Sequence, residues 1–213
     1  RKPREIKFRE ATVWTLFYVA IAIGFGLWVL NYFGPKYGTE FFAAYLVEYS
    51  LSIDNLFIFV IILTQFAVPR MDHQRVLLIG IVLALIFRAV FIAIGAVALA
   101  NFTFTFVIFG AILIWTGIGL FKHWDEDPDP SENMLVRKIR KKIAIVDEFH
   151  GSKLFVKIDG KKLATPMFLV IIAVGSTDLL FALDSIPATF GVTSEPFLVF
   201  TANAFALLGL RAL

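Results

Sequence analysis

The sequence predicts an all-α membrane protein: a polytopic bundle of transmembrane helices with inverted-topology repeats and a small cytoplasmic loop that contains a β-hairpin. Three observations lead to this prediction. Apolar residues come in runs of the length that crosses a bilayer, about 20 residues for a helix. Basic residues are largely confined to alternate connections between these runs. A short pattern of acidic and polar residues occurs twice, in runs that would cross the membrane in opposite directions.

The composition agrees with a membrane protein. Of the 213 residues, 59% are hydrophobic and only 17% are charged, and the mean hydropathy is +0.80. A soluble domain usually carries about 25% charged residues. Cysteine is absent, so the sequence offers neither a disulfide nor a thiolate ligand. The net charge of +3 does not indicate nucleic-acid binding, because the basic residues are sorted by membrane side.

Six apolar runs predict six spans and divide the chain into three parts. The expected helices cover approximately residues 11–30, 41–65, 76–99, 102–121, 166–190 and 197–213. Residues 1–121 would form the first part of the membrane domain with the first repeat. Residues 122–164 would form a cytoplasmic loop, and residues 165–213 would hold the second repeat. The last run is still apolar at its end, so we expect the chain to be part of a longer membrane protein.

The basic residues predict the orientation. In a six-span topology, 17 of the 20 basic residues fall on one side, in the N-terminal segment, around residues 69–75 and in the loop 122–164. The other side holds Lys36 alone. Short loops rich in Lys and Arg stay in the cytoplasm. We therefore expect a plasma-membrane protein whose N-terminal segment and loop 122–164 are cytoplasmic.

The loop 122–164 is too long for a bare connector. Ser131 is placed to cap a short basic helix over residues 132–143. The pair Asp159-Gly160 is a turn signal and predicts a β-hairpin over residues 153–164. The basic face of this loop would lie near lipid headgroups, so membrane lipid is an expected partner. A regulatory or protein-binding role for the loop is the alternative.

Six charged residues fall inside the apolar runs, where each costs about 2.5–3.5 kcal/mol on insertion scales. They are Glu48, Asp54, Arg88, Asp178, Asp184 and Arg211. Some lie close enough to a span end to reach the interface, but Asp54 and Arg88 do not. Salt bridges that only hold helices together are the alternative explanation. Such bridges are poor stabilisers for their desolvation cost, so a functional site is favoured.

The acidic pattern of the second run returns in the fifth. Residues 48–55 read EYSLSIDN and residues 178–185 read DLLFALDS. Each has an acid, five residues, a second acid and then an amide or hydroxyl side chain. Arg88 and Arg211 hold similar places in the runs that follow. Because the two acidic runs cross in opposite directions, we expect an inverted repeat with a binding site near the midplane and alternating access.

The spacing places the two acids of each repeat on different helix faces. Six residues turn a straight helix by a net angle of about 120°. Both acids can then reach one ion only if the helix bends or breaks. Pro187 supplies a cause in the fifth run, because its ring clashes with the carbonyl of Leu183. Ser50 and Ser52 supply a weaker cause in the second run.

The ligands in the apolar runs are hard oxygens, which suit Mg²⁺, Ca²⁺ and Mn²⁺. The candidate metal ligands are Asp54, Asp184, Glu48, Asp178, Asn55 and Ser185. Four carboxylates against two arginines leave two negative charges, which a dication would neutralise. Protons are the alternative occupant, because close carboxylates raise each other's pKa.

The candidate residues are expected to contribute unequally. Asp54 and Asp184 hold equivalent places in the two repeats and are the expected principal ligands. Glu48 and Asp178 are expected nearer the span ends, in a supporting or entry role. Arg88 is expected to balance Asp54 or Asp184 in the empty site.

The segments 48–57 (EYSLSIDNLF) and 178–188 (DLLFALDSIPA) resemble the signature segments of the TerC family of integral membrane proteins. This family is named for tellurium resistance and includes the Alx-type manganese exporters. The resemblance covers nearly the whole chain, including residues 202–212. It implies export or handling of Mn²⁺ at the acidic residues, no permanently bound cofactor, and further helices beyond both ends. One departure is Gly175, where many members carry a Glu, so no role of that Glu is carried over.

Two other functions are left open beside a transporter for a hard divalent cation. An intramembrane aspartyl protease needs two membrane aspartates, and Asp54 and Asp184 could supply them. Such enzymes carry Gly-x-Gly-Asp, whereas residues 175–178 read GSTD. A membrane scaffold could recruit partners through the loop 122–164 and use its acids structurally or to sense metal. Export of Mn²⁺ is the preferred prediction, and an enzyme is not expected.

Overall fold

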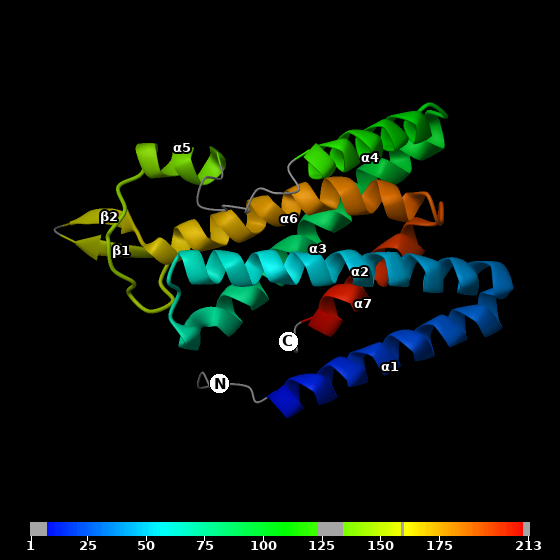
Figure 1. Ribbon diagram of the computed structural model, residues 1–213, viewed down its shortest axis with the longest axis horizontal. Coiled ribbons are helices and arrows are strands. Elements are labelled where there is room, and N and C mark those ends of the chain that lie inside the picture. Colours follow the sequence, from blue (N-terminus) through cyan, green and yellow to red (C-terminus); the bar gives the residue numbers. More distant parts are fainter. Residues whose placement is uncertain (1–7, 123–133, 159, 211–213) are drawn as a thin grey trace.

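The computed structural model of the protein describes residues 8–122, 134–158 and 160–210. These residues form seven helices and one two-stranded antiparallel sheet (Figure 1). The elements are α1 (Phe8–Phe33), α2 (Pro35–Gln65), α3 (Arg70–Asn101), α4 (Thr105–Lys122), α5 (Met134–Lys142), β1 (Phe155–Ile158), β2 (Lys161–Ala164), α6 (Pro166–Phe190) and α7 (Pro196–Leu210).

The helices α1 and α2 form a hairpin with a single residue between them. That residue, Gly34, has a φ of 98°, a left-handed conformation that glycine adopts without strain. Pro35 then begins α2 at a position where its missing N–H is not needed. At Gly38 the two helices approach so closely that an added Cβ would lie 2.5 Å from the Cβ of Leu30. The first helix is therefore packed tightly against the second.

The helices α2 and α6 lie in contact and run in opposite directions (Figure 1). The helix α3, which follows α2, packs mainly against α6. In the same way α7, which follows α6, packs mainly against α2. The α2–α3 pair is thus interlocked with the α6–α7 pair. This interlocking brings the two acid-bearing helices together.

Apolar packing ties the other helices to this central pair. One buried cluster joins α2, α3, α5 and α6 and includes Val76 and Val174. A second cluster joins α1, α2 and α7 around Phe41. A third cluster joins α3, α6 and α7 around Ile92 and Phe190. The described helices other than α4 therefore share buried side chains with α2 or α6, and α4 packs on the outside of α6.

Large apolar side chains also cover the outer faces of the helices. In α3, the exposed residues Leu78, Val82, Ile86 and Val90 follow at intervals of four and form a stripe along one face. An exposed apolar surface of this extent suits lipid rather than water. The helices α1, α2, α3 and α6 are long and apolar enough to cross a membrane, whereas α4 and α7 are shorter apolar helices. Each of the six expected spans is thus helical over most of its described residues, and four of the helices have spanning length.

The expected short helix and hairpin of the long loop are also present. The helix α5 is strongly basic at its end, and β1 and β2 pair around Gly160, which has a φ of 77°. The ring of Phe155 lies 4.9 Å from the ring of Phe168 and attaches the hairpin to α6. Ser131, the expected cap of the short helix, lies outside the described residues.

The connections that carry basic residues gather at one end of the bundle. In Figure 1, α5, the hairpin and the connection between α2 and α3 lie together at the end where α6 begins. The connection between α1 and α2, next to Lys36, lies at the opposite end with the one between α6 and α7. The fold therefore separates the described loops in the same way as the sorting of basic residues along the sequence.

Candidate functional site

Two carboxylates from the antiparallel helices α2 and α6 lie deep inside the bundle. Glu48 of α2 and Asp178 of α6 are both 0% exposed. Glu48 lies near the middle of α2 because this helix begins at Pro35, earlier than expected, and Asp178 lies near the middle of α6, whose bounds are those expected. The expectation that they lie nearer the span ends is therefore wrong.

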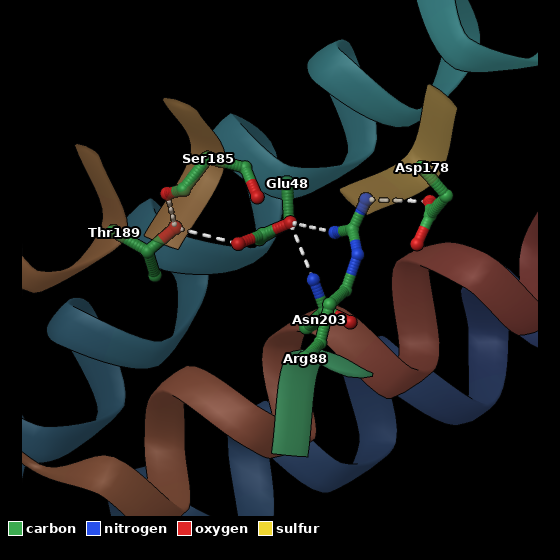
Figure 2. Close-up of polar contacts among 6 residues, drawn as sticks. All are labelled: Glu48, Arg88, Asp178, Ser185, Thr189 and Asn203. Atoms are coloured by element: carbon green, nitrogen blue, oxygen red, sulfur yellow. Dashed lines mark hydrogen bonds and ion pairs between the residues drawn. The ribbon is translucent and has the colours of Figure 1, made fainter. Parts of the chain in front are cut away.

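Arg88 of α3 bridges these two carboxylates (Figure 2). Its Nη1 donates to Glu48 Oε2 at 2.9 Å, and its Nη2 donates to Asp178 Oδ1 at 3.4 Å. Arg88 is itself 0% exposed, and a guanidinium that stays charged requires such partners when it is buried. The expectation that it balances Asp54 or Asp184 is wrong, because those acids face other sides of their helices.

Two residues that the sequence analysis did not single out hold Glu48 from the other side. The Asn203 Nδ2 of α7 donates to Glu48 Oε2 at 2.7 Å, and the Thr189 hydroxyl of α6 lies 2.7 Å from Glu48 Oε1 (Figure 2). The sequence contains a weak signal for each. Asn203 is the one amide in the last apolar run. Thr189 follows Ser185 by four residues and shares its helix face.

Further polar groups surround this pair. Asn55 is buried on α2, and with its amide turned so that Nδ2 donates to the Leu51 carbonyl, its Oδ1 accepts from Arg88 Nη2 at 3.2 Å. Three buried oxygens nearby have no hydrogen-bond partner among the described residues, namely Asp178 Oδ2, Ser185 Oγ and Asn203 Oδ1. Buried polar atoms are normally paired. These oxygens are therefore available to a ligand.

The second acid of each repeat lies apart from this cluster. Asp54 is exposed on α2, and Asp184 is half-buried next to Thr116 of α4. Among the described residues, no three His, Cys, Asp or Glu side chains gather closely enough to hold a metal ion. The structure therefore brings Glu48 and Asp178 together and keeps Asp54 and Asp184 away from them.

Neither acidic helix is broken. The helix α2 is continuous from Pro35 to Gln65, and α6 continues through Pro187 to Phe190. Pro187 lies in the last turn, where the Gly191 N–H donates to its carbonyl at 3.0 Å. The missing N–H of Pro187 removes one helical bond, to the Leu183 carbonyl, and α6 stays helical through it, so the expected break is wrong. The other expected charge-balancing residue, Arg211, lies outside the described residues.

The cluster combines hard oxygen atoms with a resident cation, the guanidinium of Arg88. Two carboxylates and one guanidinium leave one negative charge in a region without solvent exposure. The remaining donors and acceptors are amide and hydroxyl groups, and the oxygens among them are the ligands that Mg²⁺, Ca²⁺ and Mn²⁺ prefer. A metal ion would need Arg88 to move away from at least one of its two partners.

These acidic segments and their surroundings match a known family. The model of the family described as "Integral membrane protein TerC family" matches residues 33–213. These residues contain the whole buried cluster. The chain belongs to the TerC family. The resemblance seen in segments 48–57 and 178–188 is thereby confirmed.

Several curated proteins are similar over most of the chain. A membrane protein of Myxococcus xanthus is 44% identical over 213 residues, which cover 100% of this chain and 67% of that protein. The thylakoid membrane protein TERC of Arabidopsis thaliana is 40% identical over 195 residues, 92% of this chain and 51% of that protein. Alx of Photorhabdus laumondii, whose name proposes a membrane-bound redox modulator, is 36% identical over 221 residues, 100% of this chain and 69% of that protein.

The chain spans about half to two thirds of the length of these relatives. The activity of a whole TerC protein is therefore a matter of proposal for this chain. No solved structure matches.

Proposed function

We propose that the protein is a membrane transporter for a hard divalent cation and that its cargo is Mn²⁺, which it exports. The observation that carries this proposal is the buried pair Glu48 and Asp178, one acid from each of two antiparallel helices, with unpartnered oxygens beside them. Ionisable groups inside a membrane are costly and commonly mark an ion pathway. A pair contributed by two helix hairpins also fits the midplane sites of transporters with inverted repeats.

The ligand chemistry supports a hard dication. Glu48 and Asp178 carry two negative charges, which a dication matches once Arg88 has moved aside. Asn55, Ser185 and their neighbours add neutral oxygens, and the chain has no cysteine to favour a soft metal. The choice of Mn²⁺ among the hard dications rests on the resemblance of the acidic segments to manganese exporters.

The arrangement of the helix pairs supports alternating access. Glu48 and Arg88 belong to the α2–α3 pair, whereas Asp178, Thr189 and Asn203 belong to the α6–α7 pair. The contacts from Glu48 to Thr189 and Asn203, and from Arg88 to Asp178, all cross between the pairs. Rocking one pair against the other would make and break these contacts around a bound ion.

We place the protein in the plasma membrane with α5 and the hairpin in the cytoplasm. The support is the clustering of basic residues at that end of the bundle. The Arabidopsis relative is named as a protein of the thylakoid membrane. The plasma membrane is therefore proposed for this chain and not for the whole family.

Flux through proteoliposomes tests the proposal. Liposomes that contain the purified protein and a Mn²⁺-quenched dye should take up Mn²⁺, and Glu48→Gln should slow the initial rate by at least about tenfold. The matched control is Glu40→Gln on the same helix, since Glu40 accepts from Thr193 at 2.7 Å, away from Arg88. This control should transport like the wild type.

Two results would count against the proposal. Flux of Mg²⁺ or Ca²⁺ without Mn²⁺ would reject Mn²⁺ as the cargo. No flux of any of the three ions through a well-folded protein would reject transport and favour a membrane scaffold.

A further inference from the structure

The two buried carboxylates are held very unequally. Glu48 receives Arg88 and Asn203 on Oε2, at 2.9 and 2.7 Å, and Thr189 on Oε1 at 2.7 Å. Asp178 receives Arg88 alone, at 3.4 Å on Oδ1, and its Oδ2 has no partner among the described residues. Figure 2 shows Arg88 reaching Asp178 with the nitrogen that points away from Glu48. The contact with Asp178 is therefore the weaker half of the bridge.

Arg88 occupies the place that a bound cation would take. Its guanidinium lies between the two acids and, like them, is 0% exposed. Charged hydrogen bonds of this kind replace the hydration that a buried cation has lost. A dication bound to the same two carboxylates would compete directly with Arg88 for their negative charge.

We propose that Arg88 is an internal competitor of the transported dication: it occupies Glu48 and Asp178 when the ion is absent, and ion binding displaces it first from Asp178. This inference rests on the proposed function, because it assigns a role to Arg88 at the same site. Displacement leaves Arg88 with partners, since Glu48 Oε2 and Asn55 Oδ1 still accept from its Nη1 and Nη2. The return of Arg88 to Asp178 would help to expel the ion.

The exchange also links ion occupancy to the packing of the two helix pairs. Arg88 is on α3 and Asp178 is on α6, and these helices belong to different pairs. Their contact exists only while Arg88 occupies Asp178. Ion binding therefore removes one polar link between the pairs, which is the kind of differential contact that shifts a two-state equilibrium.

The decisive measurement is the affinity of Arg88→Gln for Mn²⁺. If Arg88 competes with the ion, its neutralisation should tighten Mn²⁺ binding by about tenfold or more, because two carboxylates lose their resident counter-charge. The slower release should lower the maximal rate of uptake and also lower the KM for Mn²⁺. Binding is measured on purified protein by the loss of the electron paramagnetic resonance signal of free Mn²⁺, and uptake is measured in proteoliposomes.

The matched control is Arg75→Gln on the same helix. Arg75 is exposed and donates to Ser152 at the end of the bundle, so its loss should leave Mn²⁺ affinity unchanged. If Arg88→Gln does not fold, Arg88→Lys replaces it. A lysine keeps one charge but lacks the planar fork that bridges two carboxylates, so this variant should also bind Mn²⁺ more tightly than the wild type.

The outcomes separate this inference from the proposed function. If folded Arg88→Gln or Arg88→Lys binds Mn²⁺ no more tightly than the wild type, Arg88 only supports the structure and the inference is wrong, while transport by the wild type stands. If the wild type neither binds nor transports Mn²⁺, both proposals fail.

Discussion

The acidic residues that repeat at a spacing of six in α2 and α6 form an inner pair and an outer pair with opposite surroundings. The inner pair, Glu48 and Asp178, is 0% exposed and shares Arg88. The outer pair is Asp54 and Asp184. Asp54 is exposed on α2, and Asp184 is half-buried beside α4. A spacing of six residues turns a helix by a net angle of about 120°, so each helix presents one acid to the interior and one to the periphery.

This comparison shows that depth along a span and burial within the bundle are different properties. The sequence places Asp54 near the middle of its apolar run and Asp184 at the equivalent place of the second repeat, which made them the expected principal ligands. Burial depends instead on which helix face meets another helix. In this fold the crossing of α3 over α6 and of α7 over α2 encloses the faces of Glu48 and Asp178.

The largest expected difference between the pairs is in stability. Glu48→Ala leaves the buried Arg88 without its closest partner and should lower the free energy of unfolding by about 3–5 kcal/mol. Asp54→Ala, the matched change on the same helix, removes an exposed side chain and should change stability by no more than about 0.5 kcal/mol. Reversible unfolding in mixed micelles with increasing dodecyl sulfate measures both. Equal losses in the two variants would show that the inner and outer acids are not distinct.

A smaller effect is expected from one hydrogen bond of the inner pair. Thr189→Val keeps the shape of the side chain and removes the hydroxyl next to Glu48, which should cost about 1.5–3 kcal/mol because the acceptor is charged. The control is Thr201→Val on α7, since within the described part of the chain the Thr201 hydroxyl donates only to carbonyls of its own helix. The same unfolding assay compares them. A larger loss at Thr201 would contradict the assignment of Thr189 to the acidic network.

The sequence was sufficient to predict the helices and which of the described connections share one end of the bundle. In a membrane, a long apolar run must form a helix so that its backbone N–H and C=O groups are hydrogen-bonded. Basic residues mark the connections at one end. Both features depend on short stretches of sequence alone. The hairpin around Gly160 was also predictable, because its turn needs a positive φ that glycine supplies.

The partners of Arg88 were not predictable in the same way. They depend on the interlocking of α3 with α6, which brings Asp178 to Arg88 across 90 residues of sequence. Asn203 and Thr189 reach Glu48 across 155 and 141 residues for the same reason. Periodicity indicates which residues share a helix face, but it does not indicate which helix covers that face.

A contact between the helix pairs offers a finer test of the inner site. At Gly80 of α3 an added Cβ would lie 2.7 Å from Val174 Cγ1 of α6, and a β-branched valine has little freedom to move away. Gly80→Ala should therefore push α3 from α6, lengthen the contact of Arg88 with Asp178 and cost about 1 kcal/mol of stability. Gly110→Ala on α4 is the control, because nothing lies within 4 Å of its added Cβ. Unchanged stability of Gly80→Ala would mean that the contact between α3 and α6 is looser than described.

The smallest change in stability is expected for substitutions in the outer pair that keep the shape of the side chain. Asp54→Asn and Asp184→Asn remove a charge that makes no ion pair among the described residues, so each should change the free energy of unfolding by no more than about 0.5 kcal/mol. Their effect on Mn²⁺ export should be smaller than that of Glu48→Gln, because neither acid lies in the buried cluster. Rescue of a Mn²⁺-sensitive, export-deficient cell at matched protein levels measures this. If Asp54→Asn abolished rescue while Glu48→Gln retained it, the ion would bind at the outer pair, and the inner cluster would be structural.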